Sequence, residues 1–219
     1  MFEKKEFIPV GLAIILMTLI IAFSNKAQGL VLDRIIIGLV ISVIIILVSL
    51  VAKKITAHNI DTKITHKIWE WQRYGFGKGS YLKKPVPMGI LLPLLLTFIS
   101  VGVIKFFTFL EFESQAMPAK AVKKYGRFRF SNINEWDDAL VGFYGLIAVL
   151  ALAIISSFIS NSWFPFRELS KYAFIYAICN IIPLSSLDGT KIFFGSKPLY
   201  ITSLVLTLIS GAVLILRVL

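Results

Sequence analysis

Cysteine, histidine and charge are scarce in this chain. It has one cysteine, Cys179, and two histidines among 219 residues, so an internal disulfide is excluded and cysteine usage does not indicate a redox compartment. Charged residues make up 16% of the chain, whereas an average soluble domain carries about 25%. Hydrophobic residues make up 57% and gather in runs. This composition excludes an ordinary soluble domain and predicts an integral membrane protein.

Several of the apolar runs are long enough to cross a bilayer, which takes about 20 residues. They cover approximately 7–23, 31–52, 139–159, 169–184 and 199–217. The first run follows a charged start and lacks a small-residue cleavage site, so we interpret it as a retained helix. The sequence therefore predicts an all-α membrane protein with about five to six transmembrane helices.

We expect one integral membrane domain over 1–219, because the length suits one compact helical domain. Its parts are an N-terminal helix pair (7–52), a basic loop (53–84), a broken segment (85–113), a strand-like loop (114–138) and C-terminal helices (139–217).

Helix-breaking and polar residues interrupt the apolar run 85–113. They are Pro85, Pro87, Gly89, Pro93, Gly102 and Lys105. A straight span has little use for them, and they favour a broken or re-entrant segment, which a membrane tolerates only where other protein covers the backbone. Six full spans is the alternative.

The net charge of +11 comes from loops that flank the apolar runs. If 85–113 enters and returns on one side, the N-terminus, 53–84, 111–138 and 188–198 share a face and hold 17 of the 23 Lys and Arg residues. That arrangement follows the positive-inside rule better than six spans do. It predicts a cell-membrane protein with a cytoplasmic N-terminus whose basic loops contact anionic lipid head groups. Nucleic acid is not expected as a partner, since no recognisable binding module is present.

The polar segments carry local signals of their own. The stretch 61–76 is compatible with a short amphipathic helix at the interface, ended by Gly75, and 126–130 alternates Arg with aromatics as a strand would. Asn134 is suited to cap a helix. We interpret four acidic residues near membrane ends as solvated flanks or helix N-terminal charges: Glu111, Glu113, Asp137 and Asp138. Gly142 and Gly145 favour close helix packing.

The most specific stretch is "NIIPLSSLDG", residues 180–189. An aspartate at the end of an apolar helix, Asp188, is costly unless it has a partner or a function. Pro183 breaks the helix before it, and Gly189 permits a tight turn beside it. On chemistry alone, a helix C-terminal turn with an interfacial Asp also fits.

The pattern Asn-x-x-Pro-x-x-x-Leu-Asp-Gly resembles the signature of the site-2 protease family, the zinc-dependent intramembrane metalloproteases. The resemblance covers roughly 40–200 and is strong only at 180–190. It implies that Asp188 stands at the position of the third zinc ligand. By the same resemblance, Asn180 stands at the position of the family's asparagine near the active site, which helps to hold the substrate. It also implies a site-2-protease-like core of membrane helices.

The family's other motif, His-Glu-x-x-His, binds zinc through two His on one helix face and activates water with the Glu. This sequence does not contain it. The best register places Ser49, Leu50 and Lys53 where the first His, the Glu and the second His would stand. One carboxylate cannot hold a catalytic zinc, and the Lys53 ammonium would repel a cation and could pair with Asp188. A further family element is eroded: Gly145 is kept, with Val149 where an Asn would be.

We therefore expect a catalytically degenerate protein without a metal or other cofactor. It would bind a transmembrane segment or another membrane partner without cleaving it. The first alternative is an active metalloprotease that uses zinc with non-standard ligands such as His58, His66 and Glu70. A small transporter or assembly factor, with Lys105 or Asp33 lining a polar path, is the second. A Ser49–Lys53 catalytic pair is disfavoured, because such a lysine must be buried and neutral, whereas Lys53 is expected at a basic interface.

Overall fold

The computed structural model describes residues 3–23, 32–73, 81–116, 134–159 and 165–218. In these parts, four helices are long and apolar enough to cross a membrane, judged by length and composition. They are α1 (Phe7–Ala22), α2 (Leu32–Asn59), α5 (Glu135–Phe158) and α8 (Lys197–Val218). The apolar run 169–184 forms α6 (Phe166–Ile181), which has only 16 residues. A mostly helical membrane protein is confirmed, with α6 too short to join the four candidate spans.

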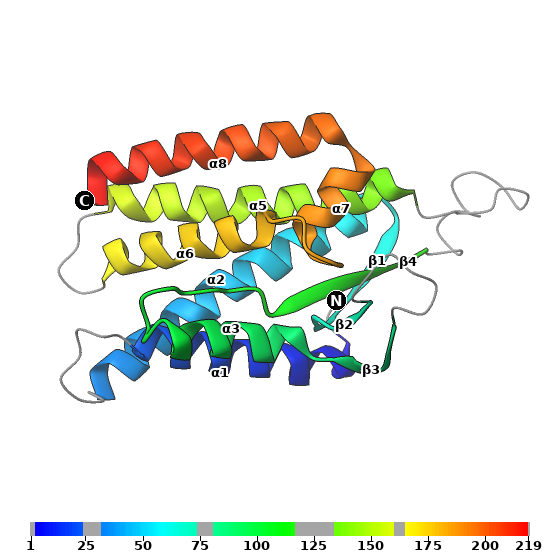
Figure 1. Ribbon diagram of the computed structural model, residues 1–219. Coiled ribbons are helices and arrows are strands. Elements are labelled where there is room, and N and C mark those ends of the chain that lie inside the picture. Colours follow the sequence, from blue (N-terminus) through cyan, green and yellow to red (C-terminus); the bar gives the residue numbers. More distant parts are fainter. Residues whose placement is uncertain (1–2, 24–31, 74–80, 117–133, 160–164, 219) are drawn as a thin grey trace, which may run out of the picture.

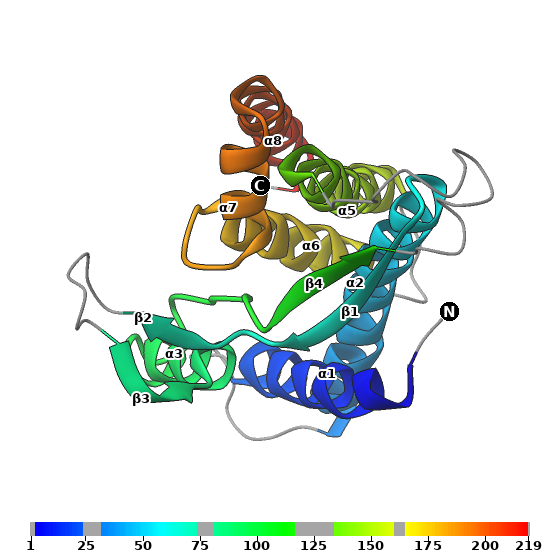
Figure 2. The same cartoon turned by 90° about the vertical axis from the view of Figure 1, so that its right-hand side faces the viewer.

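Helices α1, α3 (Met88–Ile99), α5, α6 and α8 run roughly along one direction, and α2 crosses them obliquely (Figure 1). Helices α5, α6 and α8 form one group together with the short α7 (Asp188–Gly195), and α1 lies on the other side with α3. Helix α2 stands between the two groups (Figure 2). The N-terminus, the strands and α7 gather at one end of the molecule, and the C-terminus lies at the other (Figure 1).

The broken segment turns back on itself, which is the shape expected of a re-entrant segment, and we call it the re-entrant hairpin. Its 12-residue helix α3 is about 18 Å long at the usual rise, too short for a hydrocarbon core of about 30 Å. The chain reverses at Gly102, which has a φ of 78° and lies against the end of α1 at Phe23. It then returns in extended form to Phe109, whose carbonyl accepts a 2.9 Å hydrogen bond from the Trp69 backbone. Both ends of the hairpin therefore lie at the strand end of the molecule (Figure 1).

The segment 61–76 is not a helix, which corrects the sequence-based expectation. Strand β1 (Thr62–Ile68) pairs antiparallel with β4 (Leu110–Ala116), and β2 (Trp71–Arg73) pairs with β3 (Tyr81–Val86). Residues of β1 alternate between more and less buried positions, which is the two-residue period of a strand. The predicted strand at 126–130 and the predicted stop at Gly75 lie outside the described residues.

Helix α2 continues beyond the predicted end of the second run, through Lys53 and Lys54 to Asn59. The basic segment therefore begins as helix, and Lys53 is held on a rigid element. Helix α5 starts as expected at Asn134, which forms a capping box with Asp137. Gly142 lies against Ile192 and the Asp188 backbone of α7, so the expected close packing at this glycine is confirmed.

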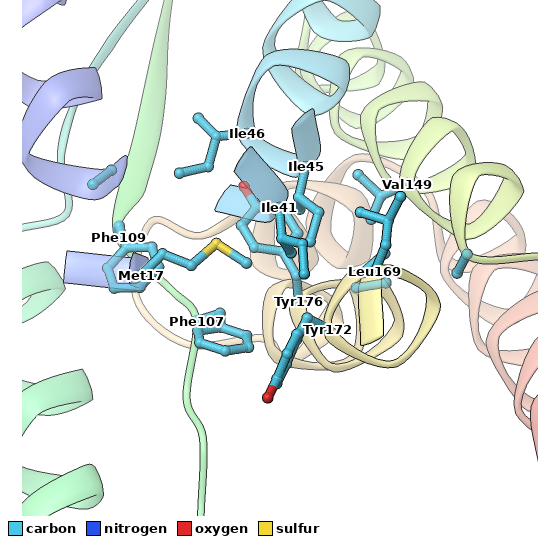
Figure 3. Close-up of a cluster of buried hydrophobic side chains, with 14 of the residues drawn as sticks. Met17, Ile41, Ile45, Ile46, Phe107, Phe109, Val149, Leu169, Tyr172 and Tyr176 are labelled. Atoms are coloured by element: carbon cyan, nitrogen blue, oxygen red, sulfur yellow. The ribbon is translucent and has the colours of Figure 1, made fainter. Parts of the chain in front are cut away.

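A large apolar cluster joins the two helix groups. Ile41 and Ile45 of α2 are fully buried and face the aromatic rings of Tyr172 and Tyr176 on α6 (Figure 3). Met17 of α1 and Phe107 of the returning chain fill the opposite side (Figure 3). The cluster fixes α2 against α6, and this contact sets the geometry of the polar residues one turn further along.

Candidate functional site

Two of the three residues that the resemblance places at zinc-ligand positions form a buried ion pair. Lys53 Nζ lies 2.5 Å from Asp188 Oδ2, and the two side chains are 3% and 4% exposed. The residues come from α2 and from the first turn of α7. Because each charge is desolvated, each needs the other to remain ionised at this depth. The expectation that Lys53 pairs with Asp188 is confirmed.

Asp188 is positioned by a close approach between α6 and α7. Helix α6 ends at Ile181, before Pro183, and Leu187 caps α7. A Cβ on Gly189 would overlap the Ile181 carbonyl oxygen, so any larger residue would push Asp188 away from Lys53. The φ of Gly189 is not positive. The glycine is therefore needed for this contact and not for the tight turn that the sequence suggested.

The aliphatic part of the Lys53 side chain packs tightly against α5. A Cβ on Gly145 of α5 would lie 2.6 Å from Lys53 Cγ. Ser49, one turn before Lys53, forms a hydrogen bond with the buried Tyr176 hydroxyl. Leu50 packs into the main apolar cluster. Of the three positions aligned with His-Glu-x-x-His, Ser49 and Lys53 thus face the α6–α7 side, and Leu50 is part of the core.

Asn180 lies on the same face of α6 as Tyr176, one turn further along. Its Nδ2 donates to the Phe107 carbonyl at 3.2 Å and to the Tyr176 carbonyl at 2.8 Å. Asn180 is 3% exposed. Its amide therefore holds the extended chain of the re-entrant hairpin instead of facing an open cleft.

Strand β4 closes the site from the strand end. The Phe112 ring lies 5.5 Å from Lys53 Nζ and 3.5 Å from Lys191 Nζ, which are favourable cation–π distances. Lys191 also donates to the Phe112 carbonyl. The ion pair is thus covered by an aromatic ring and by a second ammonium, that of Lys191, which also interacts with Asp138 and Glu111.

Glu111 is not the solvated flank that the sequence suggested. It is 4% exposed, pairs with Lys67 at 3.0 Å and accepts a hydrogen bond from Ser186 in the loop before Asp188. Burial raises the pKa of the Glu111 carboxyl, an effect that Lys67 opposes. Its neighbour Glu113 is exposed and also pairs with Lys67. Glu111 therefore ties β4 to the loop that presents Asp188.

The alternative metal ligands are not brought together. His66 lies on β1 and its Nδ1 is 3.2 Å from Glu6, the buried acid of the 3-10 helix η1 (Lys4–Glu6). Burial lowers the pKa of His66, assisted by Lys53 and Lys54 and opposed by Glu6. Glu70 lies beyond the end of β1, so it is not one helical turn from His66. In the described part of the chain, no group of three or more His, Cys, Asp or Glu side chains could hold a metal ion.

Three neighbours of the ion pair were not expected from the sequence. Tyr176 precedes Asn180 by four residues, so helical periodicity could have placed it on the same face. Lys191 follows Asp188 by three residues in α7, so the same periodicity could have placed it there. Phe112 carries no comparable signal, because its contact with Lys191 joins residues 79 positions apart.

No protein family model matches the chain, and no curated protein and no solved structure is detectably similar to it.

Proposed function

We propose that this chain is a catalytically inert, site-2-protease-like membrane protein that binds a transmembrane segment of a partner without cleaving it. The observation that supports this proposal best is the Lys53–Asp188 ion pair. It joins two of the three chain positions that the signature and its register assign to zinc ligands. The proposed setting is the cell membrane with the N-terminus in the cytoplasm, as the distribution of basic residues favours.

The residues at these positions do not fit a catalytic zinc. Such a site needs three protein ligands and one open position, whereas Ser49, Lys53 and Asp188 offer one carboxylate. The Lys53 ammonium takes the place of the cation and neutralises Asp188 by itself. Leu50 cannot act as the base that activates water. Proteolysis by a zinc-bound water has no support in this set of side chains.

Metal content tests the proposal directly. We would measure zinc in detergent-purified wild-type protein, in Asp188→Ala and in a triple variant carrying Ser49→His, Leu50→Glu and Lys53→His. The wild type and Asp188→Ala should contain no zinc above the buffer blank, and the triple variant should bind about one zinc per chain, as a three-ligand site does.

Two results of the zinc measurement would contradict the proposal. Zinc near one per chain in the wild type, lost on Asp188→Ala, would favour the active-metalloprotease alternative with ligands from elsewhere. A triple variant that folds and binds no zinc would instead contradict the site-2-protease-like geometry. Adding Asp188→Ala to a zinc-binding triple variant is the matched control, since it should lower the zinc affinity.

A further inference from the structure

Residues 103–104 complete the turn of the re-entrant hairpin, and residues 105–108 of its returning chain have no strand partner among the described elements, whereas the Phe109 carbonyl already accepts from the Trp69 backbone. Side chains of α6 take the place of that partner. Asn180 Nδ2 donates to the Phe107 carbonyl at 3.2 Å, and Cys179 Sγ lies 3.8 Å from the Lys105 carbonyl. Helix α6 therefore recognises alternate carbonyl groups of an extended polypeptide, as an edge strand would.

The side chains of this segment follow the same two-residue period. Phe107 and Phe109 are fully buried and their rings lie 6.2 Å apart, and Phe107 also meets the Tyr172 ring edge-on (Figure 3). Lys105 reaches the Tyr172 hydroxyl at 3.1 Å. The α6 face thus accepts a basic residue followed by two aromatic residues at alternate positions.

Other features weaken the docking of this segment. Val101, at the turn, has a φ of 52°, and a β-branched residue in this region is strained by about 1–3 kcal/mol. Lys105 is held by a hydroxyl and a backbone carbonyl, neither of which neutralises its charge. Helix α3 exposes much of its apolar surface, including Leu95 and Phe98, and packs mainly against α1 and β1. Burial of two aromatic rings is thus opposed by the strain at Val101 and by the partial burial of the Lys105 ammonium, a cost that the Tyr172 ring at 4.6 Å reduces in part.

We infer that residues 103–109 form a releasable latch, and that the α6 face beneath it binds an extended, aromatic-containing segment of a membrane partner once the latch is released. The nature of the partner rests on the proposed function. The latch itself depends only on the contacts of residues 101–109. Docked, it covers Asn180 and Cys179; released, it exposes the α6 side of the site next to Asp188.

Cys179 reports release, because it is the only thiol in the chain and lies under the latch. We would measure its alkylation by N-ethylmaleimide in nanodiscs. Asn180→Ala removes a hydrogen bond of about 1 kcal/mol and should speed alkylation about fivefold. Val101→Asn places a residue that tolerates positive φ at the turn and should slow alkylation by at least about fivefold.

Two matched variants separate the latch from general stability. Ser170→Ala removes a buried 2.7 Å hydrogen bond from α6 to the Ala153 carbonyl of α5. Val103→Asn makes the same Val-to-Asn substitution as Val101→Asn, at an exposed residue two positions further along. Neither should change the alkylation rate by more than about twofold, a difference of roughly 0.4 kcal/mol. Equal rates in all four variants and the wild type would overturn the latch.

A peptide copy of residues 103–109 tests the binding face. Phe107→Ala removes the buried ring of the latch and should raise the alkylation rate at least about tenfold. Added peptide should then restore protection of Cys179, whereas a copy with both positions 107 and 109 changed to Ala should not. Protection by both peptides, or by neither, would overturn the binding site. Because no metal is measured, these results are independent of the zinc test of the proposed function.

Discussion

The Lys53–Asp188 pair makes a prediction whose size follows from burial. Lys53→Met leaves the Asp188 carboxylate buried without its cation, and Asp188→Asn leaves the ammonium unpaired. Each single substitution should lower the free energy of unfolding by about 3–5 kcal/mol, the cost of breaking a buried pair by removing one partner. The double variant carries no charge at either position, and it should be within about 1–2 kcal/mol of the wild type, since an uncharged replacement of a buried pair is often neutral.

The assay is equilibrium unfolding in mixed micelles, followed by tryptophan fluorescence. The two single variants and the double variant form a double-mutant cycle, and the coupling should be about 4–8 kcal/mol from these costs. The surface pair Lys63–Glu3 provides the control, because its side chains are 43% and 34% exposed and such pairs contribute about 0–1 kcal/mol. If the double variant costs the sum of the two single variants, the Lys53–Asp188 contact does not govern the stability of the site.

Two further predictions concern the surroundings of the pair. Because burial lowers the folded-state pKa of His66, the unfolded chain binds more protons below about pH 6.5, so the stability should fall as the pH drops below that value, by up to about 1.4 kcal/mol per pH unit. Unfolding curves from pH 7 to 5 should show this slope in the wild type and in His58→Asn, and a reduced slope in His66→Asn; equal slopes in all three would contradict the assignment. Gly145→Ala places a Cβ within 2.6 Å of Lys53 Cγ and should destabilise the protein by about 1–3 kcal/mol, whereas Gly11→Ala, with no neighbour within 4 Å, should have almost no effect. Equal unfolding free energies for the two alanine variants would show that Lys53 is not confined by α5.

Hydrophobic periodicity located the long helices, because a bilayer-spanning run is a local property of the sequence. It could not locate strands β1 and β4, since a strand is stabilised by a partner that lies about 50 residues away. The stretch around His66 shows the difference: its residues fit a helix face as well as a strand, and only the pairing with Phe112 decides between them. The same non-local pairing buries Glu111, which the sequence alone placed in solvent.

The contact between Lys53 and Asp188 was predictable for a different reason. A carboxylate inside a membrane protein needs a compensating charge, and the register provided Lys53. By contrast, the role of Asn180 was not predictable. Its amide holds the carbonyl of Phe107, which lies near because the chain reverses before it, and the sequence does not show the positive φ of Val101 at that turn.

The electrostatics of the site also limit how a metal could be regained. Asp188 lies among two ammonium groups, those of Lys53 and Lys191, and one aromatic ring, so a metal cation bound to this carboxylate would be repelled by both ammonium groups. Lys53→His alone removes one charge and adds one ligand, which gives two protein ligands where zinc needs three or more. We expect this single variant to be less stable than the wild type, because His cannot reproduce a 2.5 Å ammonium–carboxylate contact while neutral, and to bind no zinc. Zinc binding by Lys53→His without Ser49→His would show that a third ligand is already present near α2, and the ligand assignment for this site would be wrong.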